Sequence, residues 1–455
     1  MIQIYDTLSR NYKNLELSNE IKIYVCGITA SGYTHLGHAF SSITFEVLDR
    51  FLTYKNFNVY RVQNFTDVDD KILDKAKSEG GTMESVAEKY ISEFFKDMAL
   101  LNVKKASYYP RATAEIGNII KFISLLQKKD LVYESNGSVY FRTNKIKKYG
   151  KLSGRDLNNN LEGSRIDIDS DKESQSDFAL WKYADTDEPG WSSPWGRGRP
   201  GWHIECSSMV LNTIGDTVDI HGGGIDLIFP HHENEIAQSE SLTGQPFSKL
   251  WMHNGMVKLA GEKMSKSLGN LITVREALKI HDPDCIRMWI LSSHYRSPIT
   301  YSPELINNYV KPLMRIKEAL SPQLTTNEIK MTESNIEFDN FDKAMSSDLN
   351  TPVALSQLLL LAKKINRSNS LNENTKKARE TLLLMLSVLG ICQNLKFENP
   401  AINRVHDQEI EKLVSERNKY RLNGDYENSD KIRDVLLEKG IKIIDSNNES
   451  KWEFI

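Results

Sequence analysis

The stretch EIKIYVCGITASGYTHLGHAF, residues 20–40, contains the local pattern on which the predicted fold depends. It begins with alternating apolar residues, Ile21, Ile23 and Val25, which is typical of a β-strand. Gly27 ends this alternation, and a loop of small residues leads into a helix-like segment, LGHAFSSITFEVLDRFLTYKN. A second strand pattern, FNVYRVQNF, precedes another turn and helix. This repeated order of strand, loop and helix predicts a parallel α/β sheet, whose ligands usually bind at the carboxyl ends of the strands.

The wider sequence predicts an α/β fold in which a Rossmann-like parallel-sheet domain contains an insertion and precedes a helical bundle and a small C-terminal module. Short strands and a polar stretch distinguish the insertion, and continuous helical spacing indicates the bundle. The expected parts are a split Rossmann-like domain at 1–110 and 196–255, the insertion at 111–195, a connecting region at 256–306, the bundle at 307–400 and the C-terminal module at 404–455.

The composition is that of an ordinary globular protein, with 455 residues of which 40% are hydrophobic and 26% are charged. No window approaches the roughly 20 apolar residues of a membrane span, and the first residues lack the apolar core of a signal peptide. We therefore expect a cytoplasmic protein with no membrane partner. The net charge of −3 argues against general coating of nucleic acid, although a local basic groove is compatible with it.

The chain has four cysteines, and its other features are not those of a secreted protein, so a disulfide framework is not expected. Cys285 and Cys392 lie in apolar, helix-like surroundings, and we interpret them as packing residues. Cys26 and Cys206 differ from them, because the first ends the predicted strand and the second lies in the unusual segment GRPGWHIECSSM.

Metal-capable side chains gather in FPHHENEIAQSE, residues 229–240, in a chain that has only 10 His. On a helix His231 and Glu235 are four residues apart and share a face, and His232 lies three residues from Glu235. This spacing offers two ligands of a zinc site, but it does not choose between the two histidines. A polar helix start whose carboxylates complement the helix dipole explains the stretch about equally well.

Two further motifs have the chemistry of a nucleotide site. HLGH, residues 35–38, lies where the loop after the first strand enters a helix, so imidazoles and helix N–H groups can bind an anion. Gly37 would let a planar ligand approach the backbone closely. KMSKS, residues 263–267, places two lysines and two hydroxyls in one short loop that suits a polyphosphate. An isolated KMSKS would be interpreted as a solvated surface turn.

The pair of HLGH and KMSKS resembles the signature of class I aminoacyl-tRNA synthetases. Almost the whole chain is similar to cysteinyl-tRNA synthetases, through segments that include QNFTDVDDKI, YGKLSGR, WSSPWGRGRPGWHIECSSM, HGGGIDLIFPHHENEIAQSE, KMSKSLGN, HYRSPITYS and DLNTPVAL. The resemblance implies that the Rossmann-like domain is catalytic, that 256–306 contacts the stem of a tRNA, and that 404–455 recognises the anticodon.

The resemblance also implies one zinc ion per chain, with Cys26, Cys206, His231 and Glu235 as its ligands. A buried Zn²⁺ can bind the thiolate of a substrate, which would distinguish cysteine from serine without a separate editing domain. Four protein ligands are more typical of a structural zinc, which is the alternative interpretation. The position of Cys26 just before the nucleotide loop favours the catalytic one.

Further site residues follow from the same resemblance. The residues expected to act in catalysis around the phosphates are His35, His38, Lys263 and Lys266. The residues expected to bind ATP are Gly37, Gly223 and Asp226, together with His35, His38 and Lys266, and Asp226 would contact the ribose. The residues expected to contact the substrate cysteine are Thr66, Asp67, Trp202 and His221. A helix cap would explain Thr66 and Asp67 about as well.

The implied reaction is the activation of L-cysteine by ATP to cysteinyl-adenylate, followed by transfer to the 3′-terminal adenosine of tRNA(Cys). Mg²⁺ would accompany ATP, catalysis would rest on positioning and electrostatic stabilisation, and the chain is expected to be a monomer. One alternative is a paralogous ligase that joins cysteine to an amino sugar, but such paralogues lack the anticodon-reading end. The other is a non-catalytic RNA-binding relative, against which the intact HLGH and KMSKS motifs argue.

The C-terminal module offers little general attraction for phosphates, because residues 404–455 contain 10 Lys+Arg and 12 Asp+Glu. Recognition of single-stranded bases would therefore depend on particular side chains that stack or donate hydrogen bonds. Trp452 and the arginines of the preceding helices are the candidates, and a Trp452 that closes a small core is equally compatible with the sequence.

Overall fold

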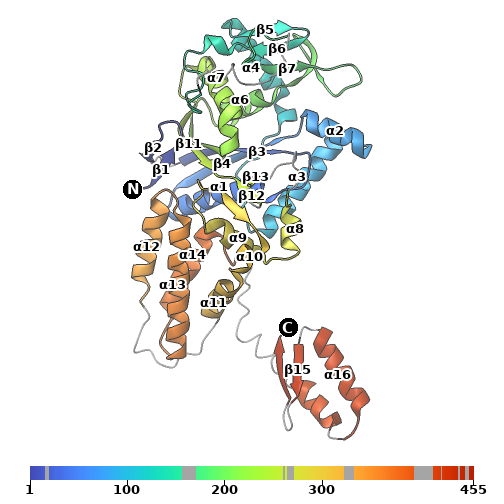
Figure 1. Cartoon of the computed structure of the whole chain (residues 1–455), viewed down its shortest axis with the longest axis vertical. Coiled ribbons are helices and arrows are strands. Elements are labelled where there is room, and N and C mark those ends of the chain that lie inside the picture. Colours follow the sequence, from blue (N-terminus) through green and yellow to red (C-terminus); the bar gives the residue numbers. More distant parts are fainter. Residues whose placement is uncertain are drawn as a thin grey trace. The chain divides into compact units, whose positions relative to one another are not determined.

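The computed structural model describes residues 1–15, 20–155, 171–259, 262–263, 271–321, 333–393, 413–421, 423–438, 441–445 and 450–454. The chain forms two compact units, whose elements are labelled in Figure 1. The first unit comprises Met1–Leu320 and Thr325–Gln393, and the second comprises Ser321–Leu324 and Asn394–Ile455. Among the described residues, no helix is both long enough and apolar enough to span a membrane.

A parallel sheet of four strands, in the order β11-β10-β3-β4, forms the centre of the first unit. The strands are β3 (Glu20–Thr29), β4 (Asn58–Thr66), β10 (Val218–Gly224) and β11 (Ser248–Asn254). The register of β3 against β4 shifts between Val25 and Ile28, which places an irregularity at Cys26 and Gly27. The predicted parallel α/β fold is therefore confirmed.

Helices cover both faces of this sheet, which explains why its strands are buried on both sides. In Figure 1, α1 (Leu36–Tyr54) and α6 (Trp202–Thr213) lie on opposite sides of the strands. Ile23 and Tyr24 are adjacent in β3, and each is fully buried. The Tyr24 hydroxyl lies 3.5 Å from Sδ of Met209, so this side chain faces α6.

The segment between β4 and β10, which includes the expected insertion, begins with helices and continues as an antiparallel sheet in the order β5-β6-β7-β9-β8. Its elements are α2 (Asp70–Glu79), α3 (Met83–Leu100), α4 (Ile116–Lys128), β5 (Val132–Ser135), β6 (Ser138–Phe141), β7 (Phe178–Tyr183), β8 (Trp191–Ser193) and β9 (Gly196–Pro200). Ile119, Phe122 and Trp181 form part of one core cluster between α4 and this sheet. Strand β9 continues the sheet five residues beyond the boundary expected at residue 195.

The chain returns to the parallel sheet through β10, α7 (Glu233–Thr243) and β11, and then enters the connecting region. The described residues of that region form a sheet of β13-β12-β14 and several short helices. The elements are β12 (Val257–Leu259), β13 (Glu262–Lys263), α8 (Val274–Leu278), α9 (Pro283–Leu291), β14 (Ile299–Tyr301) and α10 (Pro303–Asn307). The remaining short elements described in the first unit lie outside this region. They are β1 (Gln3–Asp6), β2 (Asn11–Asn14), η1 (Ala112–Glu115), η2 (Thr143–Lys145), η3 (Ile225–Leu227) and η4 (Ile228–His232).

The predicted bundle consists of α11 (Val310–Leu320), α12 (Asn335–Ser346), α13 (Thr351–Ser370) and α14 (Lys376–Leu389). Helix α1 packs against both the parallel sheet and α14, so it lies between the sheet and the bundle (Figure 1). A helix enclosed on most sides buries most of its residues, and those of α1 include the carboxylates of Glu46 and Asp49. Cys285 and Cys392 are buried, as expected for packing residues.

The second unit contains a helix at residues 413–421, α16 (Tyr426–Glu438) and the hairpin β15 (Ile441–Asp445) and β16 (Ser450–Phe454). Val414 and Leu436 form its small core, against which Ile443 packs. Residues 404–412 of the expected C-terminal module lie outside the described residues. The backbone of Trp452 pairs with Ile443, and the described part of the structure does not include the Trp452 side chain.

Candidate active site

Four side chains from separate elements present ligand atoms to one buried point. They are Cys26 of β3, Cys206 of α6, His231 of η4 and Glu235 of α7, and their ligand atoms all lie within 4.8 Å of one another. The two cysteine sulfurs are 3.9 Å apart, and Sγ of Cys26 is 3.4 Å from Oε1 of Glu235. Nε2 of His231 is 2.9 Å from the same carboxylate oxygen, across one helical turn.

A close approach between β3 and β4 sets the position of Cys26. The backbone N–H of Gly27 donates to Oδ1 of Asn64 at 2.8 Å. A Cβ atom at Gly27 would lie 1.7 Å from the Asn64 carbonyl oxygen, so only glycine fits at this position. The irregularity in the strand register therefore depends on Gly27, and it directs the preceding cysteine into the cluster.

Further histidines surround the four candidate ligands. Nδ1 of His203 lies 2.9 Å from Nδ1 of His231, and the Trp202 ring stacks on His231 with 4.3 Å between ring centroids. Nε2 of His221 lies 2.7 Å from Oε2 of Glu235, but the pair is not aligned as a hydrogen bond, since neither atom has a hydrogen-bond partner among the described residues.

His232 belongs to a second possible ligand set, which consists of Cys26, His221, His232 and Glu235. Its Nε2 lies 3.3 Å from Sγ of Cys26, and its Nδ1 lies 2.8 Å from Nε2 of His253. Nδ1 of His253 is in turn 2.8 Å from Oγ1 of Thr7. The two sets share Cys26 and Glu235, so Cys206 and His231 distinguish the first set from the second.

The cluster strongly shifts the pKa values of its members. Burial alone would lower the pKa of His231, but Glu235 and Cys206 outweigh it and raise that pKa to about 10. Burial would raise the pKa of Glu235, but His221 and His231 hold it well below its usual range. The hydrogen bond from Cys26 lowers the pKa of Cys206 to about 6. Negative charge at this point therefore favours a bound proton or cation.

Glu233, a second carboxylate of this stretch, has a different function from the one its sequence position suggests. Its side chain is buried and accepts hydrogen bonds from the backbone N–H groups of Leu152 and Ser153, at 3.1 Å and 2.9 Å. It thereby holds the loop that contains YGKLSGR against the start of α7. A contribution to the helix dipole alone does not account for the carboxylates of this stretch.

A cavity of about 560 Å³ lies beside the cluster, at the carboxyl ends of β3, β10 and β11. Its lining includes Cys26, Trp202, His35, His38 and Asp226. Cys206, His231 and Glu235 are buried behind Cys26 and Trp202. The candidate metal ligands and the HLGH motif are therefore parts of one site.

The two histidines of HLGH are fixed to each other at the start of α1. The backbone N–H of His38 lies 3.3 Å from Nδ1 of His35, and the N–H of His35 lies 3.5 Å from Nδ1 of His38. The rings are stacked with 3.6 Å between their centroids. Gly37 lies between them, where a Cβ atom would be 3.0 Å from the His35 ring. This reciprocal cap leaves the helix start facing the cavity.

Both ends of the KMSKS segment are attached near this site. Lys263 pairs with Lys258 in the β12–β13 hairpin. After the motif, the N–H of Leu36 donates to the carbonyl of Ile272 at 3.0 Å, and the N–H of Val274 donates to the carbonyl of Thr34 at 2.8 Å. Lys266 and the side chain of Lys263 lie outside the described residues.

The residues expected around the substrate cysteine occupy different positions. Trp202 lines the cavity, whereas His221 is fully buried beside Glu235. Thr66 donates to Oε2 of Glu205 at 3.1 Å. Asp67 accepts hydrogen bonds from the backbone N–H and the hydroxyl of Thr113, at 2.9 Å and 2.6 Å.

Thr66 and Asp67 do not cap α2, whose cap is Asp69, which accepts from the N–H of Lys71. The N–H of Thr113 from which Asp67 accepts lies in the first turn of η1. Asp67 also lines a neighbouring cavity of about 350 Å³. At the end of β10, Gly224 lines the larger cavity, whereas the Cα of Gly223 faces Leu227 and His232.

Sequence reasoning missed His203 and His253. His203 lies three residues before Cys206, and on a helix this spacing indicates a shared face, so a signal was present. His253 had no such signal, since its place follows from the pairing of β11 with β10, which aligns it with Gly223.

Comparison with known proteins finds two family models that match this chain, and both matches lie in the first unit. Residues 13–311 match the family model of the tRNA synthetases class I (C) catalytic domain, and residues 340–393 match the DALR domain. Relatives named cysteine–tRNA ligase include those of Dehalococcoides mccartyi and Fervidobacterium nodosum, each 43% identical with 99% of both chains covered. The cysteine–tRNA ligase of Clostridioides difficile is 43% identical, with both chains covered completely.

Solved structures support the fold at lower sequence identity. Methionyl-tRNA synthetase of Mycobacterium tuberculosis in complex with methionyl-adenylate superposes with a TM-score of 0.57 at 14% identity, over 81% of this chain and 89% of that one. The LeuRS of Agrobacterium radiobacter, in a ternary complex, gives 0.57 at 11% identity, over 82% and 84%. The full-length relatives and the catalytic-domain match together show that this chain belongs to the cysteine–tRNA ligase family of class I aminoacyl-tRNA ligases.

Proposed function

We propose that the chain activates L-cysteine with ATP to cysteinyl-adenylate and transfers cysteine to the 3′-terminal adenosine of tRNA(Cys). The observation that carries the proposal is the meeting of four candidate metal ligands beside the cavity that His35, His38 and Asp226 line. The full-length similarity to relatives named cysteine–tRNA ligase supports the choice of substrate.

The first ligand set fits Zn²⁺ in its chemistry and its spacing. Two thiolates, an imidazole and a carboxylate are common zinc ligands, and two sulfurs at about 2.3 Å from a tetrahedral zinc lie about 3.8 Å apart. The sulfurs of Cys26 and Cys206 are 3.9 Å apart. We therefore propose Cys26, Cys206, His231 and Glu235 as the ligands of one Zn²⁺ per chain. When bound, the ion would supply a Lewis acid that takes the substrate thiolate as a ligand.

Neighbouring side chains orient these ligands. His203 and Trp202 hold the ring of His231 from two sides, and His221 lies against Glu235. Such supporting contacts fix the rotamers of metal ligands and tune their basicity. We assign His221 to this supporting role, and Trp202, which also lines the cavity, to the wall of the cysteine pocket. We also propose Thr66 and Asp67 for contact with the α-amino group, which would have to share them with their present partners Glu205 and Thr113.

The other wall of the cavity would bind ATP. The N-terminus of α1 and the rings of His35 and His38 offer donors to the phosphates, and Gly37 allows close approach. Asp226 of η3 offers acceptors to the ribose hydroxyls, and Gly223 and Gly224 end strand β10 just before it. Lys263 and Lys266, together with Mg²⁺, would balance the charge that develops on the leaving pyrophosphate.

No side chain needs to form a covalent intermediate, because the carboxylate of cysteine attacks the α-phosphate directly and the ribose hydroxyl of the tRNA then attacks the adenylate. The chain contributes by positioning these groups and stabilising their charge. We further propose that residues 256–306 contact the acceptor stem and that residues 404–455 read the anticodon.

Cysteine-dependent exchange of labelled pyrophosphate into ATP tests the first step. We expect exchange with cysteine and at least about 100-fold less with serine, because a hydroxyl keeps its proton at neutral pH and binds zinc far less well than a thiolate does. Charging of tRNA(Cys) transcript tests the second step, with an amino sugar as the competing acceptor. Exchange without cysteine, or transfer to the sugar and not to the tRNA, would contradict the proposal.

A further inference from the structure

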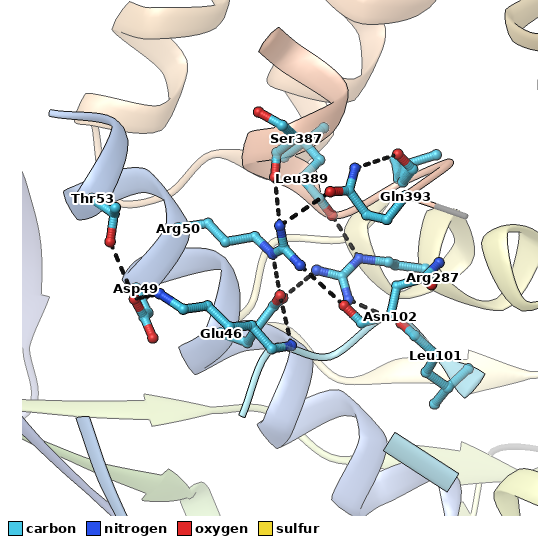
Figure 2. A network of polar contacts seen from close by, with 12 residues as sticks. Glu46, Asp49, Arg50, Thr53, Leu101, Asn102, Arg287, Ser387, Leu389 and Gln393 are labelled. Carbon is cyan, nitrogen blue, oxygen red and sulfur yellow. Dashed lines mark hydrogen bonds and ion pairs between the residues drawn. The ribbon is translucent and has the colours of Figure 1, made fainter. Parts of the chain in front are cut away.

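A buried polar cluster joins the helix that begins with HLGH to the end of the helical bundle (Figure 2). Its centre is Glu46 of α1, whose side chain is completely buried. Arg50 of the same helix and Arg287 of α9 both form ion pairs with Glu46. Two guanidinium groups around one carboxylate leave excess positive charge, and buried donors need further acceptors.

Backbone carbonyls at the C-terminal end of α14 supply two of these acceptors. Nε of Arg287 donates to the carbonyl of Leu389 at 2.6 Å, and Nη1 of Arg50 donates to the carbonyl of Ser387 at 3.0 Å. The last carbonyls of a helix have no partner within it and form the negative end of its dipole. The two arginines therefore cap α14 while they pair with α1 (Figure 2).

The segment after α3 completes the cluster. Nη1 of Arg287 donates to the carbonyl of Leu101 at 3.1 Å, and Nη2 of Arg50 donates to the carbonyl of Asn102 at 3.2 Å. Each guanidinium thus uses its rigid fork to join α1 to two other segments, which a lysine cannot do with one ammonium group. The cluster therefore fixes the orientation of α1, as well as its distance from α14 and from the segment after α3.

The backbone at the end of α14 is shaped to accept Arg287. Gly390 follows the helix with φ of 66°, in the left-handed region that favours glycine. A Cβ atom at this position would lie 2.2 Å from Nη2 of Arg287 and 2.4 Å from its Cζ. The guanidinium can lie against Leu389 only because residue 390 has no side chain.

The opposite end of α1 carries the nucleotide site. Glu46 lies eight residues after His38, which is about 12 Å along a helix at 1.5 Å per residue. His35 and His38 line the cavity, and their rings are fixed to the first turn of α1. A tilt or shift of α1 at Glu46 would therefore move both imidazoles.

We propose that Arg50 and Arg287 are positioning residues for adenylate formation, which hold α1 against the end of α14 and thereby place His35 and His38. The inference rests on the proposed function, because it assigns further residues to the same reaction. A buried ion cluster is a poor source of stability compared with apolar packing of similar volume. Apolar packing has no preferred direction, so it would fix the position of α1 less specifically than these hydrogen bonds and ion pairs do.

Arg50→Met in the full chain tests the proposal, because Arg50 is partly exposed and the buried Arg287 still pairs with Glu46. We expect kcat for cysteine-dependent pyrophosphate exchange to fall about 10- to 100-fold, since a displacement of about 1 Å can cost 100-fold. KM for cysteine should not change, because its proposed site lies on β3, α6 and α7. Gly390→Ala should give the same pattern, because the added Cβ would displace Arg287 from the carbonyl of Leu389.

Two matched variants separate positioning from stability. Lys104→Met removes an ion pair with Asp49 of α1, at 3.1 Å, that does not involve α14, and it should leave kcat unchanged. Arg50→Lys keeps the charge beside Glu46 and should recover thermal stability but not kcat. All rates are to be measured at least about 10 °C below the melting temperature of each variant.

Normal kcat in both Arg50→Met and Gly390→Ala would overturn the inference. Equal losses in Lys104→Met, or full recovery of kcat in Arg50→Lys, would also overturn it, because general stability or charge alone would then explain the effect. Failure of the proposed function would be visible separately, as absence of cysteine-dependent exchange in the unsubstituted protein, and the inference would fail with it.

Discussion

Cys206 is the residue that best distinguishes the two possible metal-ligand sets. It belongs only to the set with Cys26, His231 and Glu235, whereas His232 belongs only to the other. Its thiol also has a pKa lowered to about 6, principally by the hydrogen bond from Cys26, so it is available as a thiolate at neutral pH. Substitution at these two positions therefore gives opposite expectations for metal content.

Cys206→Ser should lower the zinc affinity of the protein by at least about 100-fold, since substitution of supporting residues alone costs about 10- to 100-fold. Elemental analysis after dialysis should show about one zinc per chain before the change and little after it. In pyrophosphate exchange, KM for cysteine should rise far more than KM for ATP, because the residues proposed to bind ATP lie on α1, β10 and η3 and are not among the proposed metal ligands.

His232→Asn is the control for this change, because it keeps a polar atom beside His253 and leaves the first ligand set complete. It should retain about one zinc per chain. Loss of zinc from His232→Asn, with full zinc in Cys206→Ser, would transfer the assignment to the second set.

At this scale, the sequence supplied residue types but not their geometry. Spacing left His231 and His232 as equal candidates, and the resemblance to a family chose His231. In the structure, His231 faces Glu235 across one turn, while His232 faces Cys26 and His253. This difference depends on contacts between distant strands and helices, which no local pattern contains.

Among the elements, the β12–β13 hairpin and the segment that follows KMSKS attach the region of residues 256–306 to the start of α1, beside the proposed ATP site. Ile272 accepts from the N–H of Leu36, and Thr34 accepts from the N–H of Val274, so the segment after the motif is held at the start of α1. The chain is therefore anchored on both sides of the motif, by the β12–β13 pairing before it and by the contacts of Ile272 and Val274 with the start of α1 after it. The prediction for Lys266 therefore concerns the proposed phosphate contact and not these anchors.

Lys266→Ala should lower kcat for pyrophosphate exchange by about 100-fold and leave KM for cysteine nearly unchanged. Removal of one group that stabilises developing charge costs about 100- to 1,000-fold in other enzymes. The exposed Lys279 at the end of α8 offers a control, and Lys279→Ala should behave as the unsubstituted protein. An equal effect of Lys266→Ala on cysteine binding would indicate a structural role.

The sequence predicted those elements that have a strong local pattern. It did not predict elements that form only because their strand pairs with a distant strand. The apolar alternation of β3 and the periodicity of the bundle helices identified those elements. Strand β9 has the sequence GRGRP, which is a poor strand former by propensity. It pairs with β7, and a Cβ atom at Gly198 would lie 2.3 Å from Nε1 of Trp181. Close approach to Trp181 explains a glycine that strand propensity alone does not account for.

At the scale of the whole molecule, the chain separates the candidate chemistry from its C-terminal end. HLGH, the candidate metal ligands and the cluster around Glu46 all belong to the first unit, which ends at Gln393. The expected bundle boundary at residue 400 lies in the second unit. The expected boundary and the observed one differ by seven residues, and both lie near the stretch NLKFENP, residues 394–400.

Deletion of residues 404–455 should leave cysteine-dependent pyrophosphate exchange within about twofold of the full chain. The truncated protein keeps Ser387–Gln393, and with them the carbonyl groups that Arg50 and Arg287 contact. Charging of tRNA(Cys) should fall by at least about 100-fold, because the loss of specific base contacts removes several increments of about 1–3 kcal/mol. Circular dichroism and a melting curve would show that the first unit remains folded.

The same truncated protein distinguishes two reasons for a loss of charging. If residues 404–455 read the anticodon, the full chain should charge an anticodon-substituted tRNA(Cys) as poorly as the truncated protein charges the natural one. The truncated protein should not distinguish the two tRNAs, since it would lack the side chains that contact the bases. Continued discrimination by the truncated protein, or unimpaired charging, would place anticodon recognition elsewhere in the chain.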